Sequence, residues 1–134
     1  MTTINHEYYV SLEVAKLLRE SGFNWECRKV YKTVMTEDLT LFTCTKEEGY
    51  RNTSEFICSA PTLDVAQRWL REVKNAHIEI SYDKERMWNV TCIFDIDKTV
   101  TIDNYYYEKY FDSYEDAQEK GIKKALEMIL EEGE

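Results

Sequence analysis

Asp95 and Asp97 are the two residues of this chain whose type and spacing could do chemistry. They lie in residues 93–101, which read IFDIDKTVT: an apolar approach, two acids one residue apart, and then Thr-Val-Thr. On a strand, residues two apart point to the same side, so both carboxylates would be presented together. One carboxylate could then attack a phosphorus atom and the other protonate the leaving group, while both bind Mg²⁺.

Residues 93–101 resemble the nucleophile motif of the haloacid-dehalogenase phosphohydrolases. The resemblance implies that Asp95 is the nucleophile and Asp97 the acid. That family places the motif on the first strand of a doubly wound parallel sheet, and later strands supply further catalytic residues. Only 39 residues follow Asp95, whereas a single βαβ unit takes about 30. We therefore interpret both aspartates as structural and predict that the protein is not an enzyme and has no catalytic residues.

Strand periodicity accounts for the same stretch without catalysis. A strand with a turn near residues 97–98 would place alternate side chains on opposite faces. The residues expected to face the core are Cys92, Phe94, Ile96, Val100 and Ile102. Those expected to face outward are Ile93, Asp95, Asp97, Thr99, Thr101 and Asp103, which makes the acids a solvated surface.

The cysteines and histidines do not form a metal-binding pattern. Cys27, Cys44, Cys58 and Cys92 are never paired as CxxC, and the two histidines lie far from them in sequence. Such spacing argues against a zinc site. Cys44 and Cys92 fall among alternating β-formers, where a free thiol behaves as a small hydrophobe. We expect no metal site and no cofactor.

The composition predicts one globular domain spanning residues 1–134. Hydrophobic residues make up 43% and charged residues 32%, with one proline and four glycines, so most of the chain should fold. The start MTTINHEYYV has neither the basic nor the apolar region of a signal peptide, and apolar runs are short. We expect a cytoplasmic protein without a membrane segment.

The net charge of −9 is concentrated in the last third of the chain. Residues 95–134 contain 12 acids and 5 bases, net −7, whereas residues 1–94 contain 14 acids and 12 bases, net −2. An acidic field repels nucleic-acid phosphate. The charge therefore favours a basic protein partner over DNA or RNA.

Three segments, residues 11–21, 62–74 and 113–131, are predicted to be helices. They begin alike, with the hydroxyl caps Ser11, Thr62 and Ser113 followed by an acid and then alanine. Gly22 lies where the first helix should end, with Phe23 placed to fold back on it. In the second helix Leu63, Ala66, Leu70 and Val73 form the apolar stripe, with Trp69 on its flank.

Between the helices the apolar period falls to two, which predicts strands at residues 27–34, 39–45, 54–59, 77–82, 87–96 and 105–111. The fold class is α+β, a mostly antiparallel sheet packed against three helices in the order αβββαβββα. The similar helix starts at residues 11 and 62 suggest an alternative, an αβββ duplication covering residues 11–59 and 62–111.

The run YYYEKYF, residues 105–111, is the candidate interface. Tyr105, Tyr106, Tyr107 and Tyr110 distribute aromatic area over both faces of a strand, and tyrosine is favoured at protein interfaces. A two-fold homodimer would cover such a patch. The alternative is a half-wet sheet whose tyrosine hydroxyls remain in water.

Residues 9–23 resemble the opening helix of small winged-helix excisionases, and Arg28, Lys29 and Lys32 follow them. This resemblance implies a DNA-binding regulator in which a recognition helix comes next. Residues 24–34, NWECRKVYKTV, instead alternate like a strand. DNA binding is therefore kept as an alternative.

The C-terminal half resembles a loose group of small uncharacterised proteins carried by prophages and other mobile elements of gut anaerobes. The resemblance depends on APT followed by a Trp-Leu-Arg-Glu-Val helix in residues 60–73, and on FDSYEDA in residues 111–117. It implies a protein-interaction or accessory module of a mobile element and brings no known activity with it.

Overall fold

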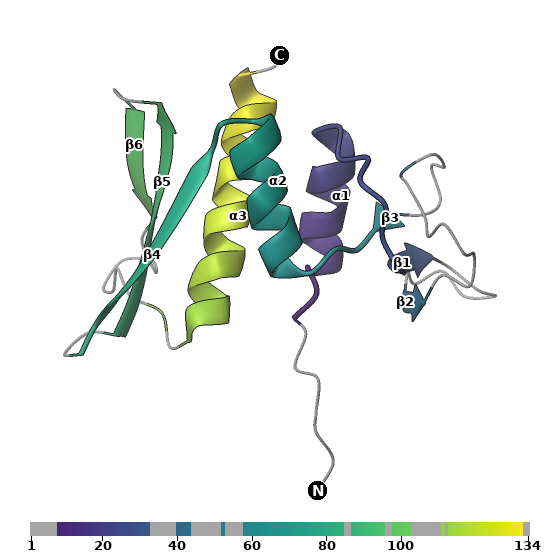
Figure 1. Ribbon diagram of the computed structural model, residues 1–134, viewed down its shortest axis with the longest axis horizontal. Coiled ribbons are helices and arrows are strands. Elements are labelled where there is room, and N and C mark those ends of the chain that lie inside the picture. Colours follow the sequence, from purple (N-terminus) through teal and green to yellow (C-terminus); the bar gives the residue numbers. More distant parts are fainter. Residues whose placement is uncertain are drawn as a thin grey trace, which may run out of the picture.

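The computed structural model describes residues 8–32, 40–43, 52, 58–84, 87–95, 98–102, 111 and 113–132. The elements along the chain are α1 (Leu12–Glu20), β1 (Lys29–Lys32), β2 (Thr40–Thr43), β3 (Cys58–Ser59), α2 (Leu63–Val73), β4 (His77–Asp83), β5 (Met87–Asp95), β6 (Lys98–Ile102) and α3 (Tyr114–Glu132) (Figure 1). The α+β class is confirmed.

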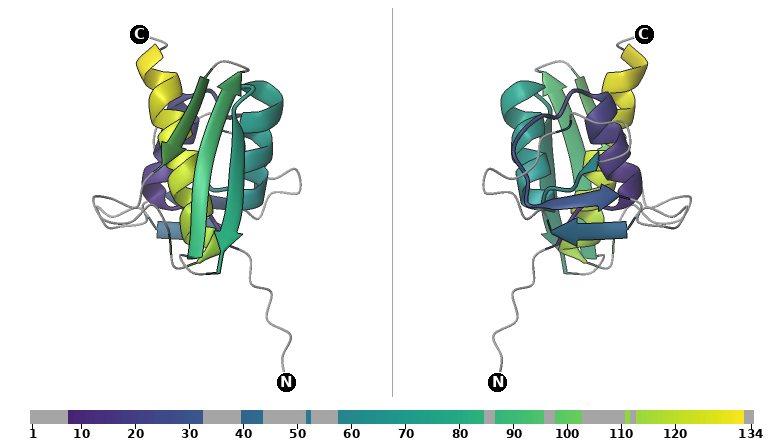
Figure 2. Two further views of the ribbon diagram at one scale, coloured as in Figure 1. Left: turned by 90° about the vertical axis from the view of Figure 1, so that its left-hand side faces the viewer. Right: turned by 90° about the vertical axis from the view of Figure 1, so that its right-hand side faces the viewer.

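The helices form a middle layer with a small sheet on each side (Figures 1 and 2). One sheet has the order β2-β1-β3 and the other β4-β5-β6, and every described strand pair is antiparallel. The predicted antiparallel pairing is confirmed, but the single sheet is wrong. Apolar side chains on the two sides of the helical layer must be shielded from water, and one sheet packs against each side.

The bounds of the strands also differ from the prediction, and the strands of the predicted order αβββαβββα lie in two sheets rather than in one. Lys98–Ile102 forms a strand that the prediction did not separate, and it pairs antiparallel with β5. Of the predicted strand 105–111, only Phe111 is among the described residues. Of the predicted strand 54–59, the structure describes residues 58 and 59, which form β3. β1, the first strand of its unit, is central in one sheet, whereas β5, the second strand of its unit, is central in the other. This difference does not support a duplicated αβββ unit, which stays a prediction.

All three helices begin at the predicted caps. The hydroxyl oxygen of Ser11 accepts a hydrogen bond from the Val14 amide at 3.3 Å, and that of Thr62 from the Val65 amide at 3.2 Å. Ser113 likewise accepts from Asp116 at 3.0 Å. These bonds satisfy amides that the first turn of a helix leaves without an intrahelical acceptor.

The helices also run in one direction, so their N-terminal ends gather at the same end of the molecule (Figure 1). Parallel helix dipoles bring three partial positive charges together there, and acidic side chains near these ends offset them. Each first turn contains such an acid: Glu13 in α1, Asp64 in α2, and Glu115 and Asp116 in α3. The common helix start in the sequence thus matches a shared physical requirement.

Gly22 ends α1 as predicted. Its φ is 98°, and its amide donates to the Arg19 carbonyl at 3.1 Å. The next amide, that of Phe23, reaches back to the Leu18 carbonyl at 2.9 Å. This left-handed helix end turns the buried Phe23 ring toward the core.

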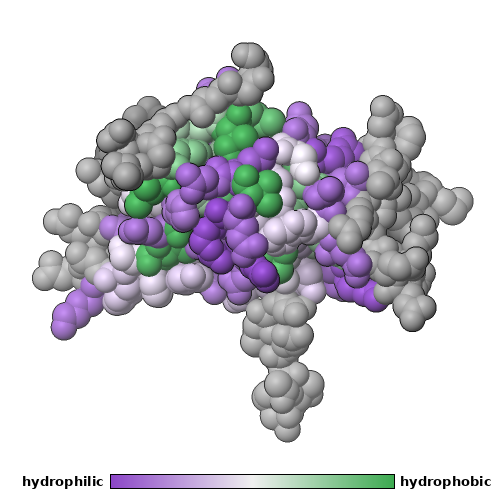
Figure 3. Space-filling model, turned by 45° about the horizontal axis from the view of Figure 1, so that its top comes forward, coloured by the Kyte–Doolittle hydropathy of each residue, from purple (hydrophilic) through white to green (hydrophobic). Residues whose placement is uncertain are grey.

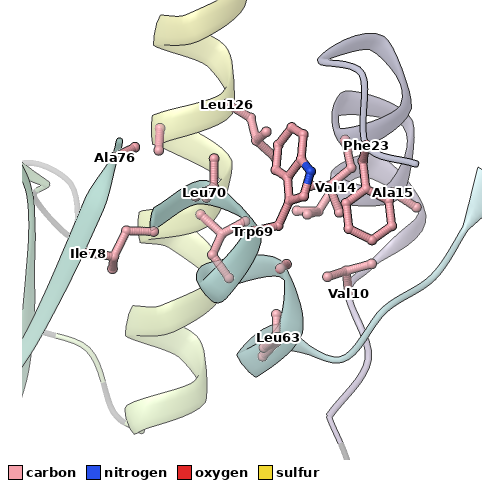
Figure 4. Packing of buried hydrophobic residues seen from close by; sticks show 14 of the residues in the cluster. Val10, Val14, Ala15, Phe23, Leu63, Trp69, Leu70, Ala76, Ile78 and Leu126 are labelled. Carbon is pink, nitrogen blue, oxygen red and sulfur yellow. The ribbon is translucent and has the colours of Figure 1, made fainter. Parts of the chain in front are cut away.

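Trp69 occupies the centre of the core between α2 and α1 (Figure 4). It is 1% exposed, and its ring meets Phe23 edge to face with 5.4 Å between centroids. The expectation that Trp69 flanks the apolar stripe and Val73 belongs to it is wrong, because Val73 is 51% exposed. A helix in a middle layer buries side chains in more than one direction, which a single stripe does not describe.

The helical spacing of the apolar residues between Tyr114 and Leu130 in the sequence predicts the inner face of α3. Ala117, Gly121, Ile122, Ala125 and Leu126 are buried, and Ile129 packs on their edge. In β5, Cys92 is fully buried and Phe94 packs against the core, as the alternation predicted. Among the helices that the structure describes, none is both long and apolar enough to span a bilayer.

Candidate functional site

Asp95 lies at the end of β5, in an antiparallel hairpin. Its backbone partner is Lys98 at the start of β6, and the strand register shifts between Ile93 and Asp95. All pairing among the described strands is antiparallel, so Asp95 does not begin a doubly wound parallel sheet. Asp97 falls outside the described residues. The fold context implied by the phosphohydrolase resemblance is therefore missing from the described part of the chain.

The candidate interface tyrosines, Tyr105, Tyr106, Tyr107 and Tyr110, lie outside the described residues. Phe111, the last residue of their run, is described: it is buried, and its backbone forms a bridge with Trp88 of β5. The tyrosine interface and the homodimer built on it remain predictions.

The basic residues after α1 lie on or beside a strand. Arg28 is exposed, and Lys29 and Lys32 begin and end β1. The Lys29 ammonium lies 5.8 Å from the centroid of the Tyr9 ring, close enough for a cation–π contact. The element that follows α1 is a strand, as the alternation predicted, and not the recognition helix of an excisionase.

The described cysteines lie in the interior of the protein. Cys27, Cys58 and Cys92 are free and buried, while Cys44 falls outside the described residues. Burial raises the pKa of Cys92 from 9.0 to about 11, which keeps its thiol neutral at pH 7. No group of three or more His, Cys, Asp or Glu side chains suited to a metal occurs among the residues the structure describes.

A groove at the N-terminal ends of α2 and α3 gathers acidic and aromatic side chains. It consists of two adjoining hollows of about 440 and 300 Å³ that share Tyr8, Leu63 and Glu115. We call it the Tyr8 groove. Its described aromatic residues are Tyr8, Tyr9, Phe111 and Tyr114, and its described charged residues are Asp64, Glu115, Asp116, Glu119 and Lys120.

Backbone hydrogen bonds fix the wall that holds Tyr8. The Leu63 amide donates to the Tyr8 carbonyl at 2.8 Å, and the Val10 amide donates to the Pro61 carbonyl at 3.0 Å. Between these two bonds Tyr9 forms an antiparallel bridge with Thr62. The segment before α1 is thus tied to the start of α2, and the Tyr8 side chain remains 51% exposed.

The opposite wall is the first part of α3, which is anchored through Tyr114. The Tyr114 ring packs edge to face on Trp88 with 5.3 Å between centroids, and Trp88 in turn packs on Tyr82. This aromatic row connects the start of α3 to the sheet β4-β5-β6. Aromatic contacts of this kind hold a groove wall in place with little loss of side-chain entropy.

Buried hydrogen bonds set the spacing of α2 and α3 beneath the groove. The Gln118 amide nitrogen donates to Asp64 Oδ1 at 2.7 Å and to Gln67 Oε1 at 2.9 Å. Gln67 then donates to the Ile78 carbonyl of β4 at 3.0 Å. Gln118 is only 2% exposed, so its amide nitrogen depends on these two acceptors for its hydrogen bonds.

The groove is electrostatically negative. Four described acids and one lysine line it, for a sum of −3. Glu119 also acts beyond the groove: the pKa of Tyr31 is raised first by burial and then by the charge of Glu119. Carboxylates beside aromatic faces recognise cations, above all the planar guanidinium of arginine, which can stack and donate paired hydrogen bonds.

Sequence reasoning missed this groove, although its acids were noticed. The sequence pattern assigns Glu115 and Asp116 to the first turn of a helix, where they lie, and it assigns no role to Glu119 or Tyr8. No local pattern places Tyr8 beside Glu115, because residues 8–9 and 113–120 are about a hundred residues apart in the chain. The signal that was present is a Tyr-Tyr pair directly before a capped helix.

Comparisons of the chain with protein-family models, curated proteins and solved structures found no match.

Proposed function

We propose that this protein is a non-enzymatic, cytoplasmic interaction module, an accessory factor of a mobile element, that binds a basic segment of a partner protein in the Tyr8 groove. The observation that supports binding is the composition of the groove: four aromatic side chains beside four carboxylates and a single lysine. The mobile-element role is supported by the resemblance in residues 60–73 and 111–117.

The expected ligand group is an arginine side chain in an extended segment. Tyr8 is exposed enough to stack on a guanidinium, and Glu115 borders both hollows of the groove. Lysine could satisfy the charge but not the stacking and the paired hydrogen bonds. Arginine peptides should therefore bind more tightly than lysine peptides of the same length.

The charge of the whole chain supports the same partner. A net charge of −9 attracts a basic protein from a distance and increases the association rate at low ionic strength. The affinity should fall as salt is added, because the Debye length shortens to about 8 Å at physiological ionic strength.

Fluorescence anisotropy with a labelled peptide of alternating arginine and glycine tests the proposal. The wild-type chain should bind the peptide, and Tyr8→Ala and Glu119→Gln should each weaken binding about threefold or more. The matched control is Glu79→Gln, which removes the same charge from an exposed position on β4. Equal weakening by Glu79→Gln would mean that only net charge matters, and the groove would be excluded as the site.

The same titration with labelled duplex DNA tests the alternative, a regulator that uses Arg28, Lys29 and Lys32. Duplex binding that decreases steeply with salt and is lost in Arg28→Gln would replace the interaction proposal. Binding of the arginine peptide with no retention of DNA would support it.

A further inference from the structure

A second groove runs between α1 and α3. It consists of two adjoining hollows of about 390 and 450 Å³ that share Leu17 and Glu127. Leu12 and Leu17 of α1 and Leu130 of α3 are half-buried along it. We call it the α1–α3 groove, and none of its described lining residues belongs to the Tyr8 groove.

An ion pair joins the two helices that form this groove. The Lys123 ammonium of α3 lies 3.1 Å from Glu13 Oε1 of α1. The hydrogen bond that the Lys123 ammonium donates to Glu13 is the main cause of the raised pKa of Lys123, and the negative charges of Glu13, Glu127 and Glu119 add to it. The outer side of this helix pair is therefore rich in negative charge even where a lysine is present.

Two acids of the groove lie at the C-terminal ends of their helices, where negative charge is unfavourable. Glu20 is the last residue of α1, and Glu131 is in the last turn of α3, which contains no basic residue. The C-terminal end of a helix carries partial negative charge and favours cations, as with Arg19 in the last turn of α1 and Arg71 in the last turn of α2. Acids in these positions destabilise their own helices, and departures from local rules of this kind concentrate at functional sites.

The rim of the groove is acidic overall. Glu13, Glu20, Glu127 and Glu131 border it together with Lys16 and Lys124, a sum of −2. An apolar floor with an acidic rim matches a helix that is apolar on one side and basic on the other. On the face where the three helices end, hydrophobic surface occurs as islands among hydrophilic residues (Figure 3), so a ligand that combines both kinds of contact suits this end of the molecule.

We infer that the α1–α3 groove docks a basic amphipathic helix of a partner protein. The apolar residues of that helix would contact Leu12, Leu17 and Leu130, and its lysine or arginine side chains would face Glu20 and Glu131. α1 has nine residues, about 13 Å of length, which accommodates two to three turns of a partner helix. A second copy of this chain is a poor occupant, because two acidic rims would face each other.

The test uses a synthetic amphipathic helix with leucines at helical spacing and lysines elsewhere, titrated against the wild-type chain and the double variant Glu20→Lys, Glu131→Lys. The wild type should bind the helix, and the affinity of the double variant should be lower by about tenfold or more. Both substitutions place a cation at a helix C-terminus, where it stabilises the fold. Weaker binding therefore would not come from unfolding, which a urea titration checks.

Two controls separate this inference from the proposed function. Tyr8→Ala should leave binding of the lysine–leucine helix unchanged, and a peptide with glutamate in place of lysine should not bind. Equal binding by the wild type and the double variant would overturn the inference. So would loss of binding in Tyr8→Ala, which would assign the helix to the Tyr8 groove and leave the proposed function standing. A wild-type dimer in light scattering that the double variant loses would assign the groove to a second copy.

Discussion

A Cβ atom added to Gly121 would lie 2.7 Å from Cγ2 of Val90 and 2.9 Å from Cγ2 of Ile78. At residue 121, α3 thus approaches the sheet β4-β5-β6 so closely that there is no room for a side chain. The two neighbours are β-branched residues in strands, whose rotamers are restricted and cannot easily move aside.

Gly121→Ala should therefore destabilise the protein, although alanine is the better helix former. Overpacking costs about 1–3 kcal/mol, and the gain in helix propensity returns only about 1 kcal/mol. Urea unfolding followed by circular dichroism measures the difference. The double variant Gly121→Ala, Val90→Ala should cost less than the sum of the single changes, and strict additivity would contradict the contact.

Trp69 and Val73 should differ sharply when each is shortened to alanine. Trp69 is 1% exposed and contacts Phe23, whereas Val73 is 51% exposed. Trp69→Ala should cost about 3–5 kcal/mol, and Val73→Ala about 0.5 kcal/mol or less. Thermal melting of both variants gives the comparison. Similar losses would restore the single stripe that the sequence predicted for α2.

The stability of the protein should depend on the side-chain amide of Gln118, which donates two hydrogen bonds. Gln118→Ala leaves Gln67 Oε1 and Asp64 Oδ1 without the amide that binds them, and we expect a cost of about 1–3 kcal/mol. Gln118→Glu places a buried carboxyl beside Asp64. That variant should gain stability as the pH falls toward about 4, because protonation restores a donor. The free energy of unfolding at pH 7 and pH 4 measures this, and a wild-type-like pH dependence would count against the hydrogen bonds.

Stability should fall at alkaline pH partly through Cys92. Its pKa is raised by burial from 9.0 to about 11. The contribution of the neutral thiol is complete below pH 9.0 and is lost as the pH rises toward about 11, because the unfolded chain ionises first. Urea midpoints at pH 8 and pH 10.5 should differ less in Cys92→Ala than in the wild type. A slope that Cys92→Ala leaves unchanged would assign the alkaline effect to other groups.

Local sequence patterns were sufficient for the helices. Ser11, Thr62 and Ser113 begin them and Gly22 ends the first, because caps depend on hydrogen bonds within a few residues. The buried faces of α3 and β5 were also predictable, since the apolar period of each element shows which of its sides is buried. The alternation in residues 24–34, which is also a local pattern, predicted that a strand would follow α1.

The number of sheets and the burial of Trp69 were decided only by the tertiary structure. A period of two predicts a strand but not which other strand it pairs with, so the separation into two sheets left no local trace. For the same reason the Tyr8 groove could not be predicted. Tyr8 and Glu115 come together because both segments pack at the start of α2, and contacts between segments about a hundred residues apart depend on how whole elements pack.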